Sequence, residues 1–269
     1  MKKVWLKDWF SFFVVIIICL VLLFIVSAVL AVMVRGIPRI AQSLATPEIQ
    51  FAIKLSLYTS LVSTVFCIFI AIPVAYALVR VDLPLKFLIN TLLDLPLALP
   101  PLVAGVCLLL FFGTTNFGAW LEGIGLSFVF TVKGIIMVQI FVNLSFMIRV
   151  MKAAFLSVNP RLEFIARTLG CTPAQAFFKI TLPLSRNGII AGAVITWARA
   201  LGEFGGVLML AGATRFRTET LPIALFLNMS TGDLDGAMAA ANLLIIISLI
   251  CLYIFNRCGG DFIGDTRGI

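Results

Sequence analysis

Residues 10–34 read FSFFVVIIICLVLLFIVSAVLAVMV, twenty-five positions without one charged side chain. A helix that crosses the hydrocarbon core of a membrane needs about 20 mostly apolar residues, and this stretch meets that length. Lys2, Lys3 and Lys7 ahead of it resemble the start of a signal peptide. The apolar core of a signal peptide is shorter, so we expect this segment to be retained as a membrane anchor.

The composition of the whole chain supports a membrane protein. Hydrophobic residues make up 62% of the 269 positions and charged residues only 12%, whereas soluble domains carry roughly 25% charged residues. These proportions exclude a soluble enzyme. The net charge of +8 would suggest nucleic acid as a partner of a soluble protein, but here Lys and Arg flank apolar runs, as membrane topology requires. We therefore expect lipid as a partner and no nucleic acid.

Five further apolar runs follow the first. The fourth of the six is the least regular, because Lys133 and Asn143 interrupt it. We predict an all-α fold with six transmembrane helices in a single membrane domain that comprises residues 1–269. The predicted spans are residues 10–34, 57–79, 87–112, 132–151, 188–210 and 237–255.

The orientation follows from the Lys and Arg residues between the spans. With the N-terminus inside, thirteen of them fall on the inner side and six on the outer side. Positive charge accumulates in cytoplasmic loops. We therefore predict a multi-pass protein of the cytoplasmic (inner) membrane with both termini in the cytoplasm.

Histidine is absent from the sequence, and the six cysteines form no CxxC pair. Ser-His-Asp hydrolysis and histidine-based metal sites are therefore excluded, and neither a zinc site nor a disulfide framework is expected. No other catalytic constellation is recognisable. We expect neither a cofactor nor an enzymatic activity in this chain.

A segment of about 152–186 between the fourth and fifth spans is too long for a simple turn. Pro160 and Pro173 each occupy a position typical of a first helical residue, and Gly170 between them fits the C-terminal cap of the first helix. We predict two short amphipathic helices, closed by Leu182-Pro183. Such a pair can fit a groove of another protein or rest on lipid headgroups, and the residues alone leave both readings open.

Three charged residues inside the predicted spans are candidates for function, because charge within a membrane is costly. Arg199 and Glu203 are four residues apart and share one helical face. Counted from the cytoplasmic start of each predicted span, the helical rise places Asp94 at a depth in the membrane similar to that of Arg199. We predict an Asp94–Arg199–Glu203 cluster in the bundle interior, either as a structural network or as a gate on a translocation route.

Prolines interrupt the third span at Pro96, Pro100 and Pro101. Each removes a backbone hydrogen bond, so the helix must kink or break there. Broken membrane helices are tolerated where they pack in protein or line a cavity. Pro100 and Pro101 are therefore candidate gate residues, with a static kink as the alternative.

The 160–183 segment resembles the EAA loop of ABC-importer permeases, whose pattern is Glu-Ala-Ala, three residues, Gly, nine residues, Ile, one residue, Leu-Pro. In the register set by Gly170, the motif falls on Ala166, Ile180, Leu182 and Pro183, whereas Phe164 and Ile165 depart from it. The resemblance implies that a separate ATPase subunit docks here. The ATPase-coupling residues that it implies are Glu163, Ala166, Arg167, Gly170, Ala174, Ile180, Leu182 and Pro183.

The departure at Phe164 changes what docking should depend on. The motif acid is missing at this position, and Glu163 lies one residue earlier. We expect apolar packing to carry the docking, with Glu163 or Arg167 supplying the polar contacts. The chain has no G-x-x-x-x-G-K-[ST] phosphate loop, which fits a permease whose motor is another polypeptide.

A narrower resemblance covers roughly 56–256. Leu99-Pro100-Pro101 and the stretch from Ala198 to Gly205 are similar to the molybdate/tungstate and sulfate permeases. Thr220-Leu221-Pro222 and Gly232-Asp233-Leu234 favour the molybdate branch. The resemblance implies a permease homodimer, two ATPase copies and an external substrate-binding protein. Arg215 and Arg217 could contact that binding protein, with an ordinary solvated loop as the alternative. Some permeases of the molybdate branch carry a C-terminal regulatory domain, and we expect none here because the sequence ends shortly after the sixth predicted span.

Two other functions compete with an ATP-driven oxyanion importer. A secondary transporter or channel would leave the Pro160–Pro183 pattern unexplained. An intramembrane enzyme would need a catalytic constellation that the sequence does not offer. Among importers, sulfate is the main rival substrate to molybdate and tungstate.

Overall fold

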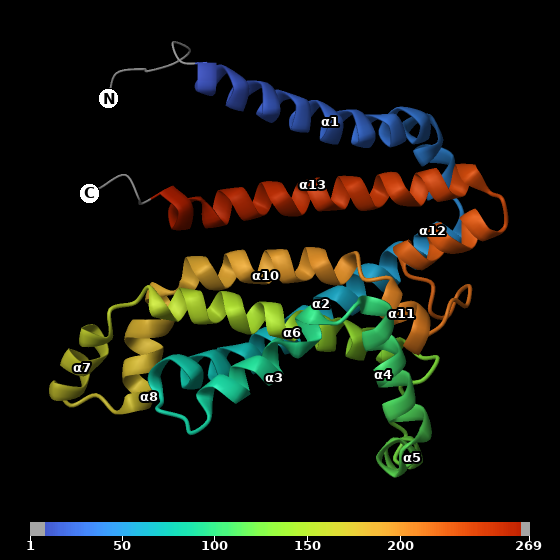
Figure 1. Ribbon diagram of the computed structural model, residues 1–269. Coiled ribbons are helices and arrows are strands. Elements are labelled where there is room, and N and C mark those ends of the chain that lie inside the picture. The colour runs from blue at the N-terminus through green and yellow to red at the C-terminus, as the bar shows by residue number, and fades with distance from the viewer. Residues whose placement is uncertain (1–8, 265–269) are drawn as a thin grey trace.

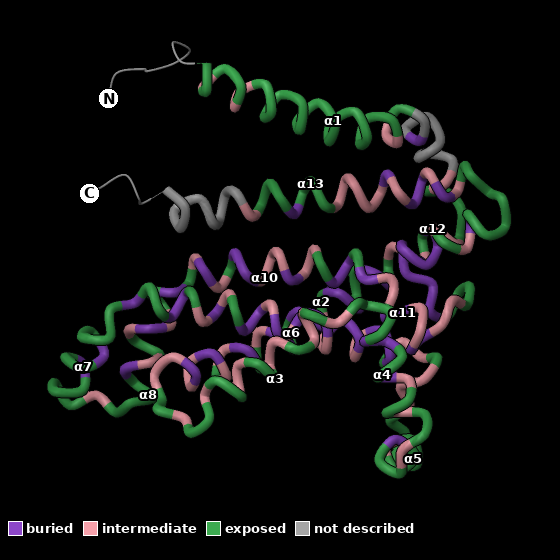
Figure 2. Tube along the Cα trace, viewed as in Figure 1, coloured by how far each residue is buried: buried purple, intermediate pink, exposed green. Residues whose placement is uncertain are grey.

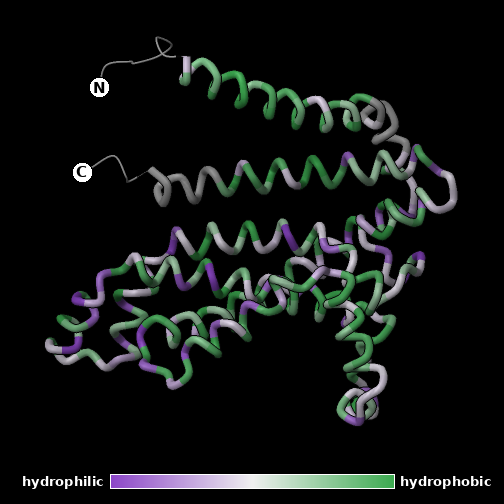
Figure 3. Tube along the Cα trace, viewed as in Figure 1, coloured by the Kyte–Doolittle hydropathy of each residue, from purple (hydrophilic) through white to green (hydrophobic). Residues whose placement is uncertain are grey.

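The computed structural model describes residues 9–264, and at residues 35, 37–42 and 256–264 it describes the backbone alone. Every regular element in this part of the chain is a helix (Figure 1), which confirms the all-α prediction. Four helices are long and apolar enough to cross a membrane, and hydrophobic residues dominate them along much of their length (Figure 3). These are α1 (Trp9–Leu44), α2 (Pro47–Arg80), α6 (Val132–Leu156) and α13 (Leu234–Gly264).

The predicted third span is broken into two helices. α3 (Lys86–Ala98) and α4 (Pro101–Thr114) meet at an angle of 107°. Leu99 and Pro100 between them are extended, with ψ of 137° at both. A residue before proline is driven out of the helical region, and two consecutive residues here precede a proline. The predicted break at the proline pair is confirmed.

The predicted fifth span, 188–210, is not one continuous helix. α10 (Arg186–Leu201) has sixteen residues, and α11 (Gly205–Leu210) is a separate short helix after a break at 202–204. Glu203 lies in this break, but the flanking residues are apolar enough that the mean hydropathy of the segment did not reveal it. α10 is shorter than the roughly 20 residues of a full crossing. The count of six spans therefore stays a prediction.

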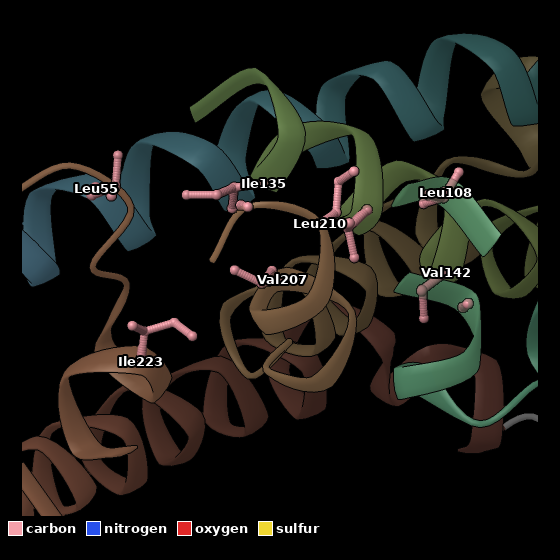
Figure 4. Packing of buried hydrophobic residues seen from close by; sticks show 10 residues of the cluster. Leu55, Leu108, Ile135, Val142, Val207, Leu210 and Ile223 are labelled. Atoms are coloured by element: carbon pink, nitrogen blue, oxygen red, sulfur yellow. The ribbon is translucent and has the colours of Figure 1, made fainter. Parts of the chain in front are cut away.

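α6 is the centre of the molecule. It packs against α2, α3 and α10, and α4 and α11 also contact it. Of its most apolar window 56% of the residues are buried, against 0% for α1, which is coloured as exposed along most of its length in Figure 2. A core of buried apolar residues joins α6 to its neighbours (Figure 4), including Leu55, Leu108, Ile135, Val142, Val207, Leu210 and Ile223. The last of these belongs to α12 (Leu221–Ser230).

The two ends of the bundle differ in the elements that they carry. α7 (Pro160–Thr168) and α8 (Pro173–Ala176) lie at the end where α1 starts and α13 finishes (Figure 1). The turn from α12 into α13 lies at the opposite end, and α5 (Asn116–Gly123) follows α4 away from the bundle. The start of α1 and the finish of α13 thus share one end with the candidate coupling helices.

α4 and α11 approach each other through glycine. A Cβ atom at Gly105 would lie 2.7 Å from the carbonyl oxygen of Gly206 and 2.8 Å from its Cα. Contacts that close to backbone cannot be relieved by rotating a side chain. The absence of a side chain at Gly105 therefore brings the two broken helices into direct backbone contact, as small residues do between membrane helices.

We expect Gly105→Ala to force α4 away from α11 and to lower the free energy of unfolding by about 1–3 kcal/mol, the usual cost of overpacking. The measurement is the thermal unfolding midpoint of the detergent-purified chain. Gly113→Ala on the same helix is the matched control, because its Cβ would meet only the Val129 side chain at 3.8 Å. Equal midpoints for the two variants would contradict the proposed backbone contact.

Candidate functional site

α7 begins and ends at the residues that the sequence predicted. The Asn159 side chain accepts a hydrogen bond from the Arg161 N–H at 3.0 Å, and Pro160 is the first helical residue. At the other end, the Gly170 N–H bonds to the Arg167 carbonyl at 3.1 Å and the Cys171 N–H to the Ala166 carbonyl at 3.0 Å. This pair of bonds is a Schellman cap. It requires the positive φ of 93° that Gly170 adopts.

The second helix of the pair is longer than predicted. Thr172 and Gln175 form a reciprocal capping box at the start of α8. The chain then continues as a π-helical turn, η1 (Phe177–Thr181), and as α9 (Leu182–Leu184). Leu182-Pro183 was predicted to close the unit, and it instead lies within this continuing run. Pro183 has no N–H, and the Leu182 N–H bonds to the carbonyl five residues back, at Phe177.

Glu163 faces the interior of the protein. Its Oε1 accepts hydrogen bonds from the Thr181 hydroxyl at 2.6 Å and from Arg80 Nε at 2.8 Å, and its Oε2 accepts one from the Tyr76 hydroxyl at 3.1 Å. The Arg80 and Glu163 side chains are only 15% and 11% exposed. We call these four residues the Glu163 joint, because they tie α7 to both α2 and η1.

Arg80 extends the Glu163 joint to α6. Its second guanidinium nitrogen donates to the carbonyls of Phe155 at 3.2 Å and of Val158 at 2.8 Å, at the end of that helix. Desolvation raises the pKa of Glu163, but the Thr181 and Arg80 hydrogen bonds and the Arg80 charge outweigh it and hold the pKa below its ordinary value. The joint is therefore intact at neutral pH and is lost only as pH falls through that lowered pKa.

The outward face of α7 is apolar. Phe164, at the motif position that usually carries the acid, is 68% exposed, and Leu169 is 80% exposed. Leu162, Ile165 and Phe178 are exposed beside them. Exposed apolar groups that surround a short, internally fixed helix are typical of a surface that another protein covers.

The predicted coupling residues thus divide into two groups. Glu163 and Ala166 are buried, so the prediction that Glu163 supplies a polar contact to a docked protein is wrong in this structure. The outward-facing Arg167 remains available for that contact. Gly170, Ala174 and Pro183 are also exposed, whereas Ile180 and Leu182 are half-buried.

The predicted Asp94–Arg199–Glu203 cluster does not form. Asp94 pairs with Arg149 at 2.9 Å. Arg199 donates to Asn143 Oδ1 at 3.3 Å, and its guanidinium carbon lies 5.1 Å from the centre of the Phe146 ring. The prediction compared depths alone and could not tell which helix lies beside α3; α3 packs against α6, which brings Arg149 to Asp94.

Glu203 has a local partner instead. Its Oε1 accepts a hydrogen bond from the Gly206 N–H at 3.0 Å, in the first turn of α11. A Cβ at Gly206 would lie 3.3 Å from the carbonyl oxygen of Pro101. The break at 202–204 and the break at Leu99-Pro100 therefore lie against each other, so Pro101 and Glu203 do belong to one region.

Several residues of the site gave no signal in the sequence reasoning. Tyr76, Arg80 and Thr181 bind Glu163 from positions 87, 83 and 18 residues away. Arg149 was counted only as an inner-side charge. Its place within a helix of strongly apolar composition could have marked it as a candidate.

Arg215 and Arg217 lie at the opposite end of the bundle. Arg215 is held by Asn228 at 2.9 Å and by Glu219 at 3.6 Å. It borders an open pocket of about 370 Å³ that Glu48 and Asp233 also line. Arg217 is exposed. A meeting between these arginines and an external protein stays a prediction.

Comparisons with known proteins identify relatives of this chain. Residues 67–258 match the family model described as "Binding-protein-dependent transport system inner membrane component". The chain is 35% identical to the molybdenum transport system permease protein ModB of Mycobacterium tuberculosis, over 85% of this chain and 87% of that protein. It is 30% identical to the sulfate transport system permease protein CysT of Escherichia coli, over 91% and 89%.

A solved structure shares the fold. A chain of a bacterial alginate ABC transporter, in complex with an alginate-bound periplasmic protein, superposes with a TM-score of 0.77. It is 21% identical in sequence, and the match covers 93% of this chain and 94% of that one.

We expect Glu163→Ala to loosen the attachment of α7. Arg80 would keep its buried charge without a carboxylate, and losing one partner of a buried ion pair costs on the order of 3 kcal/mol. Amide hydrogen exchange of 160–170 should therefore accelerate, and Glu163→Gln, which retains an acceptor, should accelerate it less. Glu122→Ala, which removes an exposed carboxylate at the other end of the protein, is the control. Unchanged exchange in Glu163→Ala would show that the Glu163 joint does not hold α7.

Proposed function

The chain belongs to the family of binding-protein-dependent transport inner membrane components, and we propose that it conducts molybdate or tungstate into the cell. Members of this family are permease subunits of ABC importers, not enzymes, and ATP is hydrolysed by a separate subunit. The observation that carries the proposal is that α7 is fixed to the protein on one side and exposes apolar residues on the other. It belongs to a membrane domain whose relatives are named as molybdenum and sulfate transport permeases.

The outward face of α7 is the surface that we assign to the ATPase. Phe164 and Leu169 would enter the groove of that subunit, and Arg167 would supply a charge at its edge. Closure of two ATPases would move α7, and the Glu163 joint would pass this movement to α2 and α6. This assignment places α7, and with it the start of α1 and the finish of α13, on the cytoplasmic side.

The two helix breaks are the region that we assign to the gate. Pro100 and Pro101 bend the third span, and Glu203 caps α11 directly beside them. Broken helices in a membrane need protein or water around their freed backbone groups. A second copy of this chain would complete the surroundings, so we propose a homodimer with the translocation route between the protomers.

The substrate class rests on the relatives and on anion chemistry. Molybdate, tungstate and sulfate are tetrahedral dianions, and permeases named for molybdenum and for sulfate are similar to this chain at 30–37% identity. The Thr220-Leu221-Pro222 and Gly232-Asp233-Leu234 segments favour the molybdate branch, with sulfate as the alternative. An external binding protein would supply the selective recognition, and the permease would offer only transient contacts.

We expect proteoliposomes that contain this chain, its ATPase and its binding protein to take up radiolabelled molybdate when ATP is supplied. Excess tungstate should compete and excess sulfate should not. Uptake of sulfate in place of molybdate would assign the chain to the sulfate branch. Uptake driven by an ion gradient in ATP-depleted vesicles would instead identify a secondary transporter and overturn the proposal.

We expect Gly170→Pro to uncouple ATP hydrolysis from uptake, because proline can neither adopt a φ of 93° nor donate to the Arg167 carbonyl. The number of ATP molecules hydrolysed per anion should rise severalfold. Gly232→Pro is a matched control. Gly232 has a φ of 79° and donates to Met229 in the same cap geometry, but it lies at the opposite end of the bundle.

Gly232→Pro should therefore weaken the fold to a similar degree while leaving hydrolysis linked to uptake. Full coupling in Gly170→Pro, measured with the complex intact, would remove α7 from the mechanism.

A further inference from the structure

One face of α6 is left uncovered between α3 and α10. Phe146, Arg149, Ala153 and Leu156 follow one another at intervals of three or four residues, so they lie along one side of the helix. Phe146 is half-buried, and the other three are exposed. The remaining sides of α6 pack against α2, α3 and α10. We call these four residues the α6 strip.

Arg149 places a charge in the middle of this strip. Its side chain is 58% exposed and that of its partner Asp94 is 42% exposed, although they lie 2.9 Å apart. Arg149 is seven residues before the end of α6 at Leu156, about 10 Å along the helix. An exposed ion pair at that depth is costly against lipid. The α6 strip must therefore face water or another protein.

A second cation lies one turn further into the membrane domain. Arg199 of α10 is exposed and rests on Phe146, with the neutral Asn143 amide as its hydrogen-bond partner. Among the side chains that the structure describes, no carboxylate lies within 4.0 Å of it, although the charge of Glu203, four residues further along the chain, acts on it. Arg199 thus forms no direct ion pair with those side chains.

A third cation follows toward the α7 end. Lys152 Nζ bonds to the Asn90 side chain at 2.5 Å, again a neutral partner. Arg199 bonds to Asn143 of α6, and Arg149 and Lys152 belong to that helix. From Asn143 to Lys152 the distance is about 13 Å along the helix axis. Among the described side chains, the middle cation is the one of the three that forms an ion pair with a carboxylate. Cations held by neutral groups keep most of their attraction for a mobile anion.

This inference rests on the proposed oxyanion transport. We propose that Arg199, beside the α6 strip, and then Arg149, within it, are successive transient contacts for the transported dianion. Asp94 competes with the anion for the Arg149 guanidinium. When the anion arrives, Arg149 exchanges Asp94 for it, and when Asp94 returns, the anion is released toward the Lys152 end. The carboxylate prevents Arg149 from holding the anion too tightly.

The main alternative assigns the Arg149–Asp94 pair a purely structural role in fixing α3 to α6. The two readings differ in what charge reversal does. A pair that only joins helices works in either order, whereas a contact for an anion needs the positive charge on α6. The doubly reversed variant Asp94→Arg/Arg149→Asp therefore separates them.

The test uses proteoliposomes that contain the complete importer, with radiolabelled molybdate and radiolabelled sulfate as probes. We expect Arg149→Met to reduce uptake of the transported anion by about tenfold or more, the value of one charge-assisted hydrogen bond. The ATPase should still copurify. Lys133→Met removes a cation from the outer end of α6, where it bonds to the Gly125 carbonyl at 2.7 Å, and should leave uptake unchanged.

The doubly reversed variant should assemble with the ATPase as the original chain does and yet remain defective in uptake. Uptake restored to the original rate would overturn the proposal, and so would full uptake in Arg149→Met. Asp94→Asn removes the carboxylate that competes with the anion, so the anion should stay longer on Arg149. ATP hydrolysis by this variant complex in nanodiscs should therefore be more sensitive to inhibition by added molybdate. If the unaltered importer transports neither anion, the proposed substrate class fails first, and this inference falls with it.

Discussion

Backbone hydrogen bonding governs this structure, because no water is available in hydrocarbon to satisfy a free N–H or carbonyl. The described chain is therefore helical wherever it is regular, and its two sharp interruptions are informative. Leu99-Pro100 and the 202–204 break lie against each other, with Gly105 and Gly206 in backbone contact. Val138 of α6 packs directly beside Gly206. Each break thus packs against protein on one side, while Pro100, Pro101 and Gly202 are exposed in the protomer. A partner that covers them would complete the surroundings that a broken membrane helix requires.

The arrangement of polarity in the coupling segment is opposite to that of an ordinary surface helix. α7 buries its acid and exposes Phe164 and Leu169. A buried ion pair contributes little net stability, because desolvation offsets most of its attraction, but it fixes geometry and is costly to break. The Glu163 joint therefore determines where α7 sits, and the apolar face determines what covers it. Binding surfaces commonly have such an apolar centre with charge at the rim.

Local signals were sufficient to predict where α7 begins and ends and where α8 begins. Asn159, Gly170 and Thr172 mark caps through their own backbone and side-chain chemistry, and the structure forms those caps. The pairings could not be predicted in the same way. Glu163 meets Arg80 across 83 residues, and nothing in either neighbourhood specifies the other. Asp94 was assigned to Arg199 by a depth argument that does not specify which helix packs against α3, and that helix is α6. The break at 202–204 was not predicted, because hydropathy reflects amino-acid composition and not backbone torsion angles.

Arg80 connects the two functional regions that we propose. One of its nitrogens binds Glu163 and another binds the carbonyls of Phe155 and Val158. Phe155 is six residues beyond Arg149, less than two helical turns, on a helix with no proline or break between them. A displacement of α7 therefore reaches the end of α6 through a single side chain. The α6 strip must follow, because a continuous helix of that length moves as one body. Movement of α7 should accordingly reach Arg149, the residue that we propose to bind the anion.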